Sequence, residues 1–279
     1  MSKLIPNKVY DITSFGPVEF DSKYLFQYSN FKYFEETLKN HKLKFTSLNK
    51  FNDLYESSYM LNYFTNKNKT YKDFSRLKDG GYEFIDELQI QNIKELIDNL
   101  LDDIKVTCFS ETPSESLMWS HYADKHKGIC YVFEKNKIFS NEDLDFCKVK
   151  YSSKLPEIDF YEGMTTRDLL KNQLISIIET KSNRWSYENE VRFYGETKDN
   201  LLEFEPKSLK AIIMGHRYTK INEATKYVDE YNNNHNTEVK LYRSVKSPDS
   251  FNLDVYEDYP VLSDNQFKVG YYDPKNYII

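Results

Sequence analysis

Glycine and cysteine are both scarce in this sequence, which has 8 glycines and 3 cysteines among 279 residues. It contains no GxSxG elbow, Walker A loop or GxGxxG fingerprint, so a glycine-rich phosphate cradle is not expected. The cysteines form no CxxC pair, and no set of Cys and His has zinc spacing. They are expected to be buried, reduced thiols. There is no continuous apolar run long enough to cross a membrane, so we expect a cytoplasmic protein without a membrane partner.

Positive charge is also in deficit. The formal net charge is -6 and the isoelectric point is near 5.5. General nucleic-acid binding relies on a positive surface, so this balance disfavours it and leaves only a local basic groove open. Aromatic residues are plentiful at 16%. The core and any pocket are therefore expected to be built from aromatic rings.

The apolar periodicities predict an α+β fold with a mixed, mainly antiparallel sheet and flanking helices. Helices are expected near residues 31–40, 85–104, 166–181 and 220–231, where apolar residues recur at three- and four-residue steps. Strands are expected near 23–28, 43–47, 105–110, 128–134, 147–151, 189–195, 201–205, 210–214 and 238–243. Residues 62–81 suggest an irregular connection. One domain over 1–247 is predicted, with a C-terminal tail at 248–279 that packs on it or is partly extended.

The most informative segment is Trp185-Ser-Tyr-Glu188-Asn-Glu190-Val-Arg192. If it forms a strand, Glu188, Glu190 and Arg192 share one face, because side chains on a strand alternate. Two carboxylates on one face repel each other unless a cation or a shared proton lies between them. Lys181 and Arg184 come just before the pair and can supply that cation. The segment therefore indicates either a substrate-facing site or a salt-bridged sheet surface.

A second candidate segment follows the predicted strand that ends at Ser110. Pro113 breaks this strand, and Trp119, His121 and Tyr122 then combine aromatic faces with a titratable imidazole. In one interpretation His121 is an acid–base group beside an aromatic pocket. In the other, the rings belong to the core of a short helix and His121 is a structural histidine.

A third segment follows the predicted strand at 43–47. Ser47, Asn52 and Asp53 offer hydroxyl, amide and carboxylate groups, which can grip a ribose or an amide. The same residues are typical of a turn that caps itself. The turn is the favoured interpretation on local evidence alone.

Several of these motifs, in this order, resemble an uncharacterised bacterial family known as domain of unknown function 2971. The resemblance runs from about Tyr24 to about Gly215 and is carried by residues 44–47 with 51–53, 108–111 with 118–123, 127–130, and Lys181 with 185–192. Where that family usually has Asn-Asp-Pro-Phe, this chain has Asn52-Asp-Leu-Tyr55. The local turn is therefore expected to differ.

A looser resemblance is to the ADP-ribosyltransferases, whose arginine-directed class carries a Glu-x-Glu on a strand. It implies that Glu190 binds the nicotinamide ribose and that Glu188 helps to deprotonate the acceptor. The early Arg or His of that superfamily is missing here. The candidate segments add His121 as a further catalytic residue. The predicted substrate-binding residues are Tyr28, Ser47, Asn52, Asp53, Ser110, Trp119, Tyr122, Lys181, Trp185 and Arg192.

Three functional hypotheses follow. The first is an ADP-ribosyltransferase or NAD glycohydrolase that consumes NAD as its substrate, with a protein or nucleic-acid acceptor and a role as a toxin or phage-defence effector. A carboxylate beside the ribose would stabilise the oxocarbenium character of the reaction. The second is a non-catalytic sensor module that binds a nucleotide-like small molecule or a protein. The third and least favoured is a metal-dependent nuclease using Glu188, Glu190 and Asp53, since no metal is predicted from so few acidic ligands.

Overall fold

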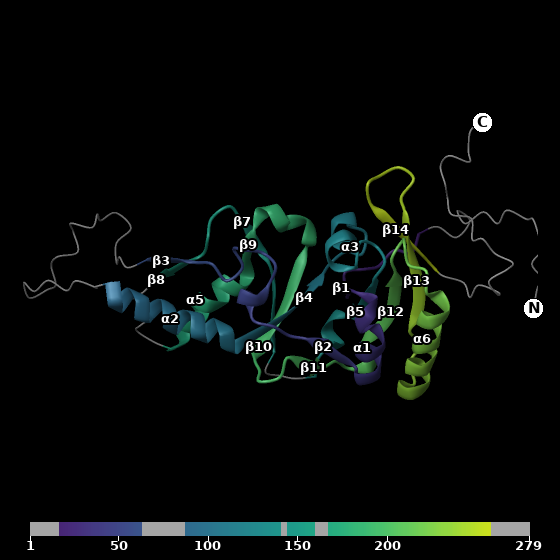
Figure 1. Cartoon of the computed structure of the whole chain (residues 1–279), viewed down its shortest axis with the longest axis horizontal. Coiled ribbons are helices and arrows are strands. Elements are labelled where there is room, and N and C mark those ends of the chain that lie inside the picture. The colour runs from purple at the N-terminus through teal and green to yellow at the C-terminus, as the bar shows by residue number, and fades with distance from the viewer. Residues whose placement is uncertain (1–16, 63–86, 141–143, 160–166, 258–279) are drawn as a thin grey trace, which may run out of the picture. The chain divides into compact units, whose positions relative to one another are not determined.

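The computed structural model describes residues 17–62, 87–140, 144–159 and 167–257 (Figure 1). The chain divides into two compact units, each assembled from separate stretches. The first unit contains residues 1–41, 111–138 and 205–279, and the second contains 42–110 and 139–204. Most of the predicted connection at 62–81 lies outside the described residues. The prediction of one domain over 1–247 stays a prediction.

The first unit is a five-stranded sheet with helices, in the strand order β14-β13-β12-β5-β1. Only β12 and β13 run parallel, and the other neighbours are antiparallel. The strands are β1 (Tyr24–Ser29), β5 (Ile129–Glu134), β12 (Leu209–Met214), β13 (Lys240–Lys246) and β14 (Leu253–Glu257). The helices are α1 (Phe34–Asn40), α3 (Ser116–Tyr122) and α6 (Ile221–His235), with 3₁₀ turns at Phe31–Tyr33, Lys135–Lys137 and Pro206–Ser208.

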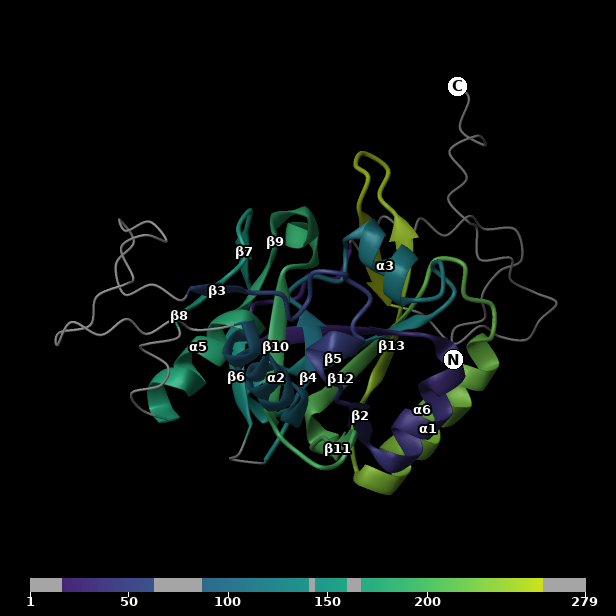
Figure 2. The same ribbon diagram turned by 60° about the vertical axis from the view of Figure 1, so that its left-hand side comes forward.

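Helix α6 connects the two parallel strands β12 and β13, as a crossover helix must. Ala224, Val228 and Tyr231 are its buried residues and recur at helical spacing. Figures 1 and 2 show α1 and α6 side by side, and the hydroxyl of Tyr227 on α6 donates to Glu35 Oε2 on α1 at 2.8 Å. Strand β14 falls within the predicted tail, so that part of the tail packs on the sheet.

The second unit has a three-stranded antiparallel sheet in the order β4-β10-β6 and three two-stranded pairs. Strands β2 and β11 pair antiparallel, whereas β3 with β8 and β7 with β9 pair parallel. The sheet strands are β4 (Ile104–Ser110), β10 (Glu190–Glu196) and β6 (Asp145–Lys148). The paired strands are β2 (Lys42–Lys44), β11 (Leu201–Glu203), β3 (Met60–Asn62), β8 (Glu157–Asp159), β7 (Lys150–Ser152) and β9 (Thr180–Ser182).

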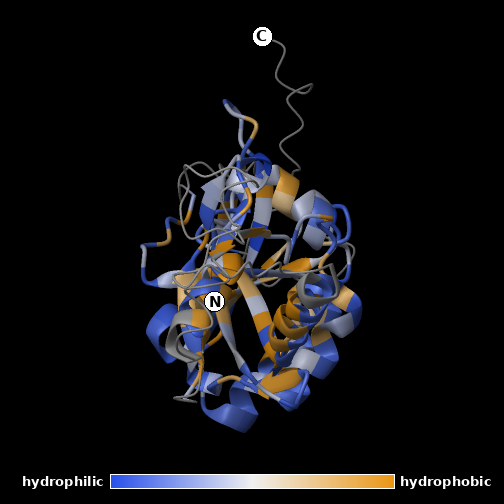
Figure 3. Cartoon of the chain, turned by 90° about the vertical axis from the view of Figure 1, so that its left-hand side faces the viewer, coloured by the Kyte–Doolittle hydropathy of each residue, from blue (hydrophilic) through white to orange (hydrophobic). Residues whose placement is uncertain are grey.

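Two helices, α2 (Glu87–Asp103) and α5 (Arg167–Glu179), supply the apolar core of this unit. Ile97 and Leu101 of α2 and Leu174, Ile177 and Ile178 of α5 belong to one buried cluster, each at three- or four-residue steps along its helix. Figure 3 shows how hydrophobic and hydrophilic residues alternate along the helices of the chain. This core fixes the end of α5, from which the chain enters β9.

The fold class is the predicted one: α+β with mixed, mainly antiparallel pairing. One local prediction is wrong. Glu188 is not on a strand, because it is the last residue of a 3₁₀ turn, Asn183–Glu188, and the strand begins only at Glu190. Between them Asn189 adopts a left-handed conformation with φ 44°, which asparagine tolerates better than most residues. The strand alternation assumed for Glu188 therefore does not apply.

Candidate functional site

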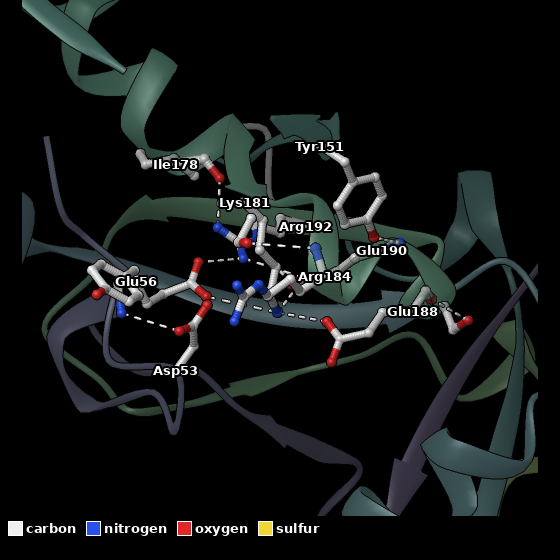
Figure 4. Close-up of polar contacts among 12 residues, drawn as sticks. Asp53, Glu56, Tyr151, Ile178, Lys181, Arg184, Glu188, Glu190 and Arg192 are labelled. Atoms are coloured by element: carbon white, nitrogen blue, oxygen red, sulfur yellow. Dashed lines mark hydrogen bonds and ion pairs between the residues drawn. The ribbon is translucent and has the colours of Figure 1, made fainter. Parts of the chain in front are cut away.

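A buried cluster of five charged side chains lies in the second unit (Figure 4). It contains three carboxylates and two cations, and every one of these residues is at most 7% exposed. The members are Glu56, Lys181, Glu188, Glu190 and Arg192. Charges this deeply buried are retained only when they are paired and hydrogen-bonded.

Arg192 is the most completely enclosed member, with a side chain that is 0% exposed. Its Nε donates to Glu190 Oε1 at 2.8 Å, and its Nη2 donates to Glu190 Oε2 at 3.2 Å. The guanidinium makes two further hydrogen bonds. Its Nη2 also donates to Glu56 Oε1, and its Nη1 donates at 2.6 Å to the carbonyl of Ile178 near the end of α5. This forked geometry is the one in which arginine binds carboxylates most strongly.

Lys181 is the second cation and joins the three carboxylates. Its Nζ lies 2.5 Å from Glu188 Oε2, 2.9 Å from Glu190 Oε2 and 3.6 Å from Glu56 Oε2. The ammonium also lies 5.3 Å from the ring centroid of Trp185, a cation–π distance. Lys181 is placed by β9, which pairs parallel with β7 so that Lys181 lies opposite Tyr151.

The cluster is unevenly neutralised, because three carboxylates face two cations. For Glu190, burial favours the neutral acid, but the charges of Arg192 and then Lys181 outweigh it and hold its pKa well below the usual value. Glu56 shows the opposite result: burial outweighs Arg192 and Lys181 and raises its pKa. Its Oε2 has no hydrogen-bond partner among the described residues. Of these two carboxyl groups, Glu56 is therefore the one more disposed to hold a proton.

Neutral groups hold the backbone around the two glutamates. The hydroxyl of Ser110 donates to the carbonyl of Glu188 at 2.6 Å, and the amide of Glu190 donates to the hydroxyl of Tyr151 at 2.9 Å. Glu190 also pairs with Ser110 in the β4–β10 register. Substrate binding by Ser110 stays a prediction, and its hydroxyl is bonded to the turn that carries Glu188.

Glu56 was not predicted as a site residue from the sequence. It lies on a series of turns in which Asp53 Oδ1 accepts from the amide of Tyr55 at 3.0 Å and the Asp53 carbonyl accepts from the amide of Glu56 at 3.2 Å. Its partner Arg192 is 136 residues away in the sequence. No local periodicity points to such a residue. The presence of a second acidic residue, Glu56, shortly after Asp53 in the sequence was a weak signal.

A pocket of about 610 Å³ adjoins the cluster within the second unit, and Lys181 is part of its wall. This volume is in the range of small-molecule sites. Three cations, three aromatic rings, four serine hydroxyls and one carboxylate line it: Lys154, Lys181, Arg184, Tyr55, Trp185, Tyr187, Ser58, Ser152, Ser153, Ser182 and Asp53. Glu188 and Glu190 lie behind Lys181 and are not among the lining residues found in the described part of the chain.

Of the remaining predicted residues of this unit, Ser47 and Asp53 make structural contacts. Ser47 is buried, and its hydroxyl donates to the carbonyl of Asp102 at 3.3 Å while accepting from Lys105 Nζ at 3.1 Å. Asn52 is exposed, and Asp53 caps the turn that leads to Glu56. Of these three, only Asp53 lines the pocket.

Four other predicted residues belong to the first unit. Trp119 is fully buried, its indole donates to the carbonyl of Pro113 at 2.7 Å, and its ring packs edge-on against Tyr28 with centroids 5.1 Å apart. The hydroxyl of Tyr28 donates to the carbonyl of Thr112 at 2.8 Å. These contacts fit the interpretation of Trp119 as a core residue. His121 is exposed beside the half-buried Tyr122, with ring centroids 6.2 Å apart.

The geometry does not favour a metal at the carboxylates. Glu188 and Glu190 already share Lys181, and Asp53 accepts a backbone hydrogen bond. Within residues 17–62, 87–140, 144–159 and 167–257, no group of three or more His, Cys, Asp or Glu side chains is arranged to hold a metal ion. In the same ranges no helix has both the length and the apolarity needed to cross a membrane.

Comparison with known proteins gives one match. Residues 118–193 match the family model described as Protein of unknown function (DUF2971). The matched segment contains Lys181, Glu188, Glu190 and Arg192 and ends within β10, so four of the five cluster residues lie inside it. No curated protein and no solved structure matches the chain.

Proposed function

We propose that the protein is a binding module whose second unit receives a nucleotide-like small molecule in the pocket beside Lys181. The observation that carries this proposal is the lining of that pocket, where Lys154, Lys181 and Arg184 occur together with the rings of Trp185 and Tyr187. Base stacking on aromatic rings contributes about 1–3 kcal/mol per base. Lysine and arginine bind phosphate oxygens through charge-assisted hydrogen bonds. The serine hydroxyls suit ribose and phosphate alike.

The two tryptophans of the chain provide the test. Trp185 lies at the pocket and Trp119 is buried in the other unit, so ligand stacking should quench only the fluorescence of Trp185. We expect saturable quenching when AMP, ATP or NAD is titrated, and no ligand response in Trp185→Phe. Arg184→Ala should weaken binding about tenfold or more, the size of one lost charged hydrogen bond. Lys171→Ala, an exposed change on α5, is the matched control and should bind as the wild type does.

The proposal is wrong if none of these nucleotides changes the fluorescence at millimolar concentration. It is also wrong if Trp185→Phe retains the full response, because the signal would then come from elsewhere.

A second candidate is the NAD-consuming activity, as an ADP-ribosyltransferase or NAD glycohydrolase. The observation in its favour is that both carboxylates of the Glu-x-Glu bind Lys181 directly. Lys181 is part of the pocket wall, so this side chain separates the two carboxylates from the pocket. Catalysis would require Glu190 to exchange Lys181 for the ribose, since both of its oxygens are now bonded to cations. Release of nicotinamide from NAD by the wild type, abolished in Glu190→Gln, is the test. Binding of NAD without release, both with and without candidate protein and nucleic-acid acceptors, would exclude this activity and leave the binding proposal intact.

We further propose a cytoplasmic location. The three cysteines, Cys108, Cys130 and Cys147, are all free thiols, which suits a reducing compartment. Microscopy of a tagged chain or fractionation of expressing cells tests this directly.

A further inference from the structure

Two loops and one strand end of the first unit meet at one edge of its sheet. The loop 215–220 follows β12, the end of β13 is Lys246, and the loop 124–128 precedes β5. Because β12 and β13 are parallel, their carboxyl ends lie at the same edge, where Met214 is paired with Arg243. Because β5 is antiparallel to β12, its first residue, Ile129, is paired with Met214 as well. The register therefore brings three separate segments together, namely the two loops and the end of β13.

The residues that these loops carry are mostly basic. The loop before β5 has Lys125, His126 and Lys127, the loop after β12 has His216 and Arg217, and β13 adds Arg243 and Lys246. Asp124 is the acidic residue in these loops, and at the start of α6 Glu223 pairs with Lys220 at 3.2 Å. With Lys220 at the end of the loop after β12, the basic residues number eight. His126, His216 and Arg243 are half-buried, whereas Lys125, Lys127, Arg217, Lys220 and Lys246 are exposed.

The backbone holds two of these loops rigidly together. The amide of Gly215 donates to the carbonyl of Gly128, and the amide of Arg217 donates to the carbonyl of His126, both at 2.9 Å. A side chain on Gly215 would have its Cβ 2.3 Å from the His126 carbonyl oxygen, so only glycine allows this approach. The loops thus cannot separate to relieve the repulsion between their cations.

The backbone of the loop before β5 is also strained. Asp124, Lys125 and His126 are three consecutive non-glycine residues with positive φ, at 46°, 54° and 69°. Such conformations cost free energy and recur at binding and active sites, where surrounding contacts enforce them. Here the backbone hydrogen bond from Arg217 to the carbonyl of His126 is one of those contacts.

The charges of these side chains act on the two histidines. Partial burial, and then the charges of Arg217, His216 and Lys246, lower the pKa of His126. Burial, and then Lys246, Arg217 and Arg243, lower the pKa of His216, against a backbone hydrogen bond with Ser244 that raises it. No carboxylate is among the main causes of either shift. Both imidazoles therefore lie in a positive local field.

We propose that His126, His216, Arg217 and Lys246 form a second anion site, which binds the phosphoryl group of a small molecule. Phosphate is the anion that fits best, because arginine and lysine bind its oxygens and two imidazoles can add donors. The net charge of -6 opposes docking of a long nucleic acid, whose binding needs many cations. A compact ligand needs only this local set. The site lies in the first unit and does not depend on the pocket beside Lys181.

Histidine NMR tests this site with pyrophosphate as the probe, at constant ionic strength set with potassium chloride. The chain has five histidines, which can be assigned from single substitutions. We expect the signals of His126 and His216 to shift saturably, and their pKa values to rise by about 0.5–1 when the anion binds. His41 and His235 serve as internal controls. They pack together at the far end of α6, roughly 22 Å from its first turn, and should not respond.

Two variants define the charge requirement. Arg217→Ala combined with Lys246→Ala should weaken pyrophosphate binding at least tenfold, whereas Arg217→Lys should retain most of it. Lys226→Ala, which removes an exposed cation on α6, is the matched control and should not change binding. The site is refuted if all histidines shift alike, if the double variant binds as tightly as the wild type, or if a DNA duplex shifts the two signals and pyrophosphate does not.

Discussion

The Nζ of Lys181 lies 2.9 Å from Oε2 of Glu190, and these side chains are only 5% and 4% exposed. The same ammonium is part of the wall of the pocket. Lys181 therefore both touches the pocket and holds the carboxylates behind it. An anionic ligand that draws Lys181 forward would leave Glu188 and Glu190 less neutralised, so ligand binding and the protonation of the cluster are expected to be coupled.

Replacing Lys181 by methionine should strongly destabilise the fold. The change keeps the length of the side chain but leaves three buried carboxylates facing a single cation, and removing one partner of a buried ion pair costs about 3–5 kcal/mol. Urea unfolding of Lys181→Met measures this loss. Lys150→Met is the matched control, since Lys150 pairs with Glu179 with its side chain 75% exposed and should cost less than about 1 kcal/mol. Equal stability of the two variants would contradict the role assigned to Lys181.

The stability of the second unit should fall in acid because of Glu190. Its pKa in the folded protein is well below the unfolded value of about 4.3, so the unfolded chain takes up a proton first. The stabilisation from Glu190 is therefore complete above that pH and is lost as the pH falls toward the folded pKa. We expect the free energy of unfolding, measured in urea, to rise from pH 3 to pH 5.

Glu56 should act with the opposite sign. Burial raises its pKa in the folded protein, so its contribution is complete below about pH 4.3 and is lost as the pH rises through the folded pKa. Glu56→Gln keeps an oxygen for Arg192 and removes this titration. The stability of the variant relative to the wild type should therefore increase as the pH rises above about 4.3. Parallel curves for the two proteins between pH 4 and pH 8 would show that Glu56 does not titrate in this way.

The fold was more predictable than the site, for a physical reason. The stripe of α2 and the apolar run of β5 are local patterns, because burial against a core repeats with the period of the element itself. The cluster depends instead on contacts between distant segments, such as that between Glu56 and Arg192. The strand assumption also failed at Glu188, because asparagine at position 189 permits the left-handed turn. Even so, Glu188 and Glu190 both bind Lys181. This contact was expected, because two neighbouring carboxylates need a cation between them.

The hydroxyl of Ser110 should contribute to stability through the turn before β10. It donates at 2.6 Å to the carbonyl of Glu188 in a buried setting, so Ser110→Ala leaves that carbonyl short of a donor. The expected loss is about 1–2 kcal/mol in urea unfolding. Ser186→Ala, an exposed change in the same 3₁₀ turn, should leave the stability nearly unchanged. If both variants unfold alike, the hydrogen bond does not hold the turn.

Gly215 should tolerate no side chain, because any Cβ would meet the backbone of the neighbouring loop. The Cβ of Gly215→Ala would lie 2.3 Å from the carbonyl oxygen of His126 and 2.9 Å from that of Gly128, and neither backbone atom can move without breaking a hydrogen bond between the loops. Overpacking of this kind costs about 1–3 kcal/mol. We expect Gly215→Ala to unfold at a lower urea concentration and to bind pyrophosphate more weakly than Ser247→Ala, a change just after β13 that keeps both loops intact. If Gly215→Ala is as stable as the wild type and its His126 NMR signal is unmoved, the loops are not locked together as described.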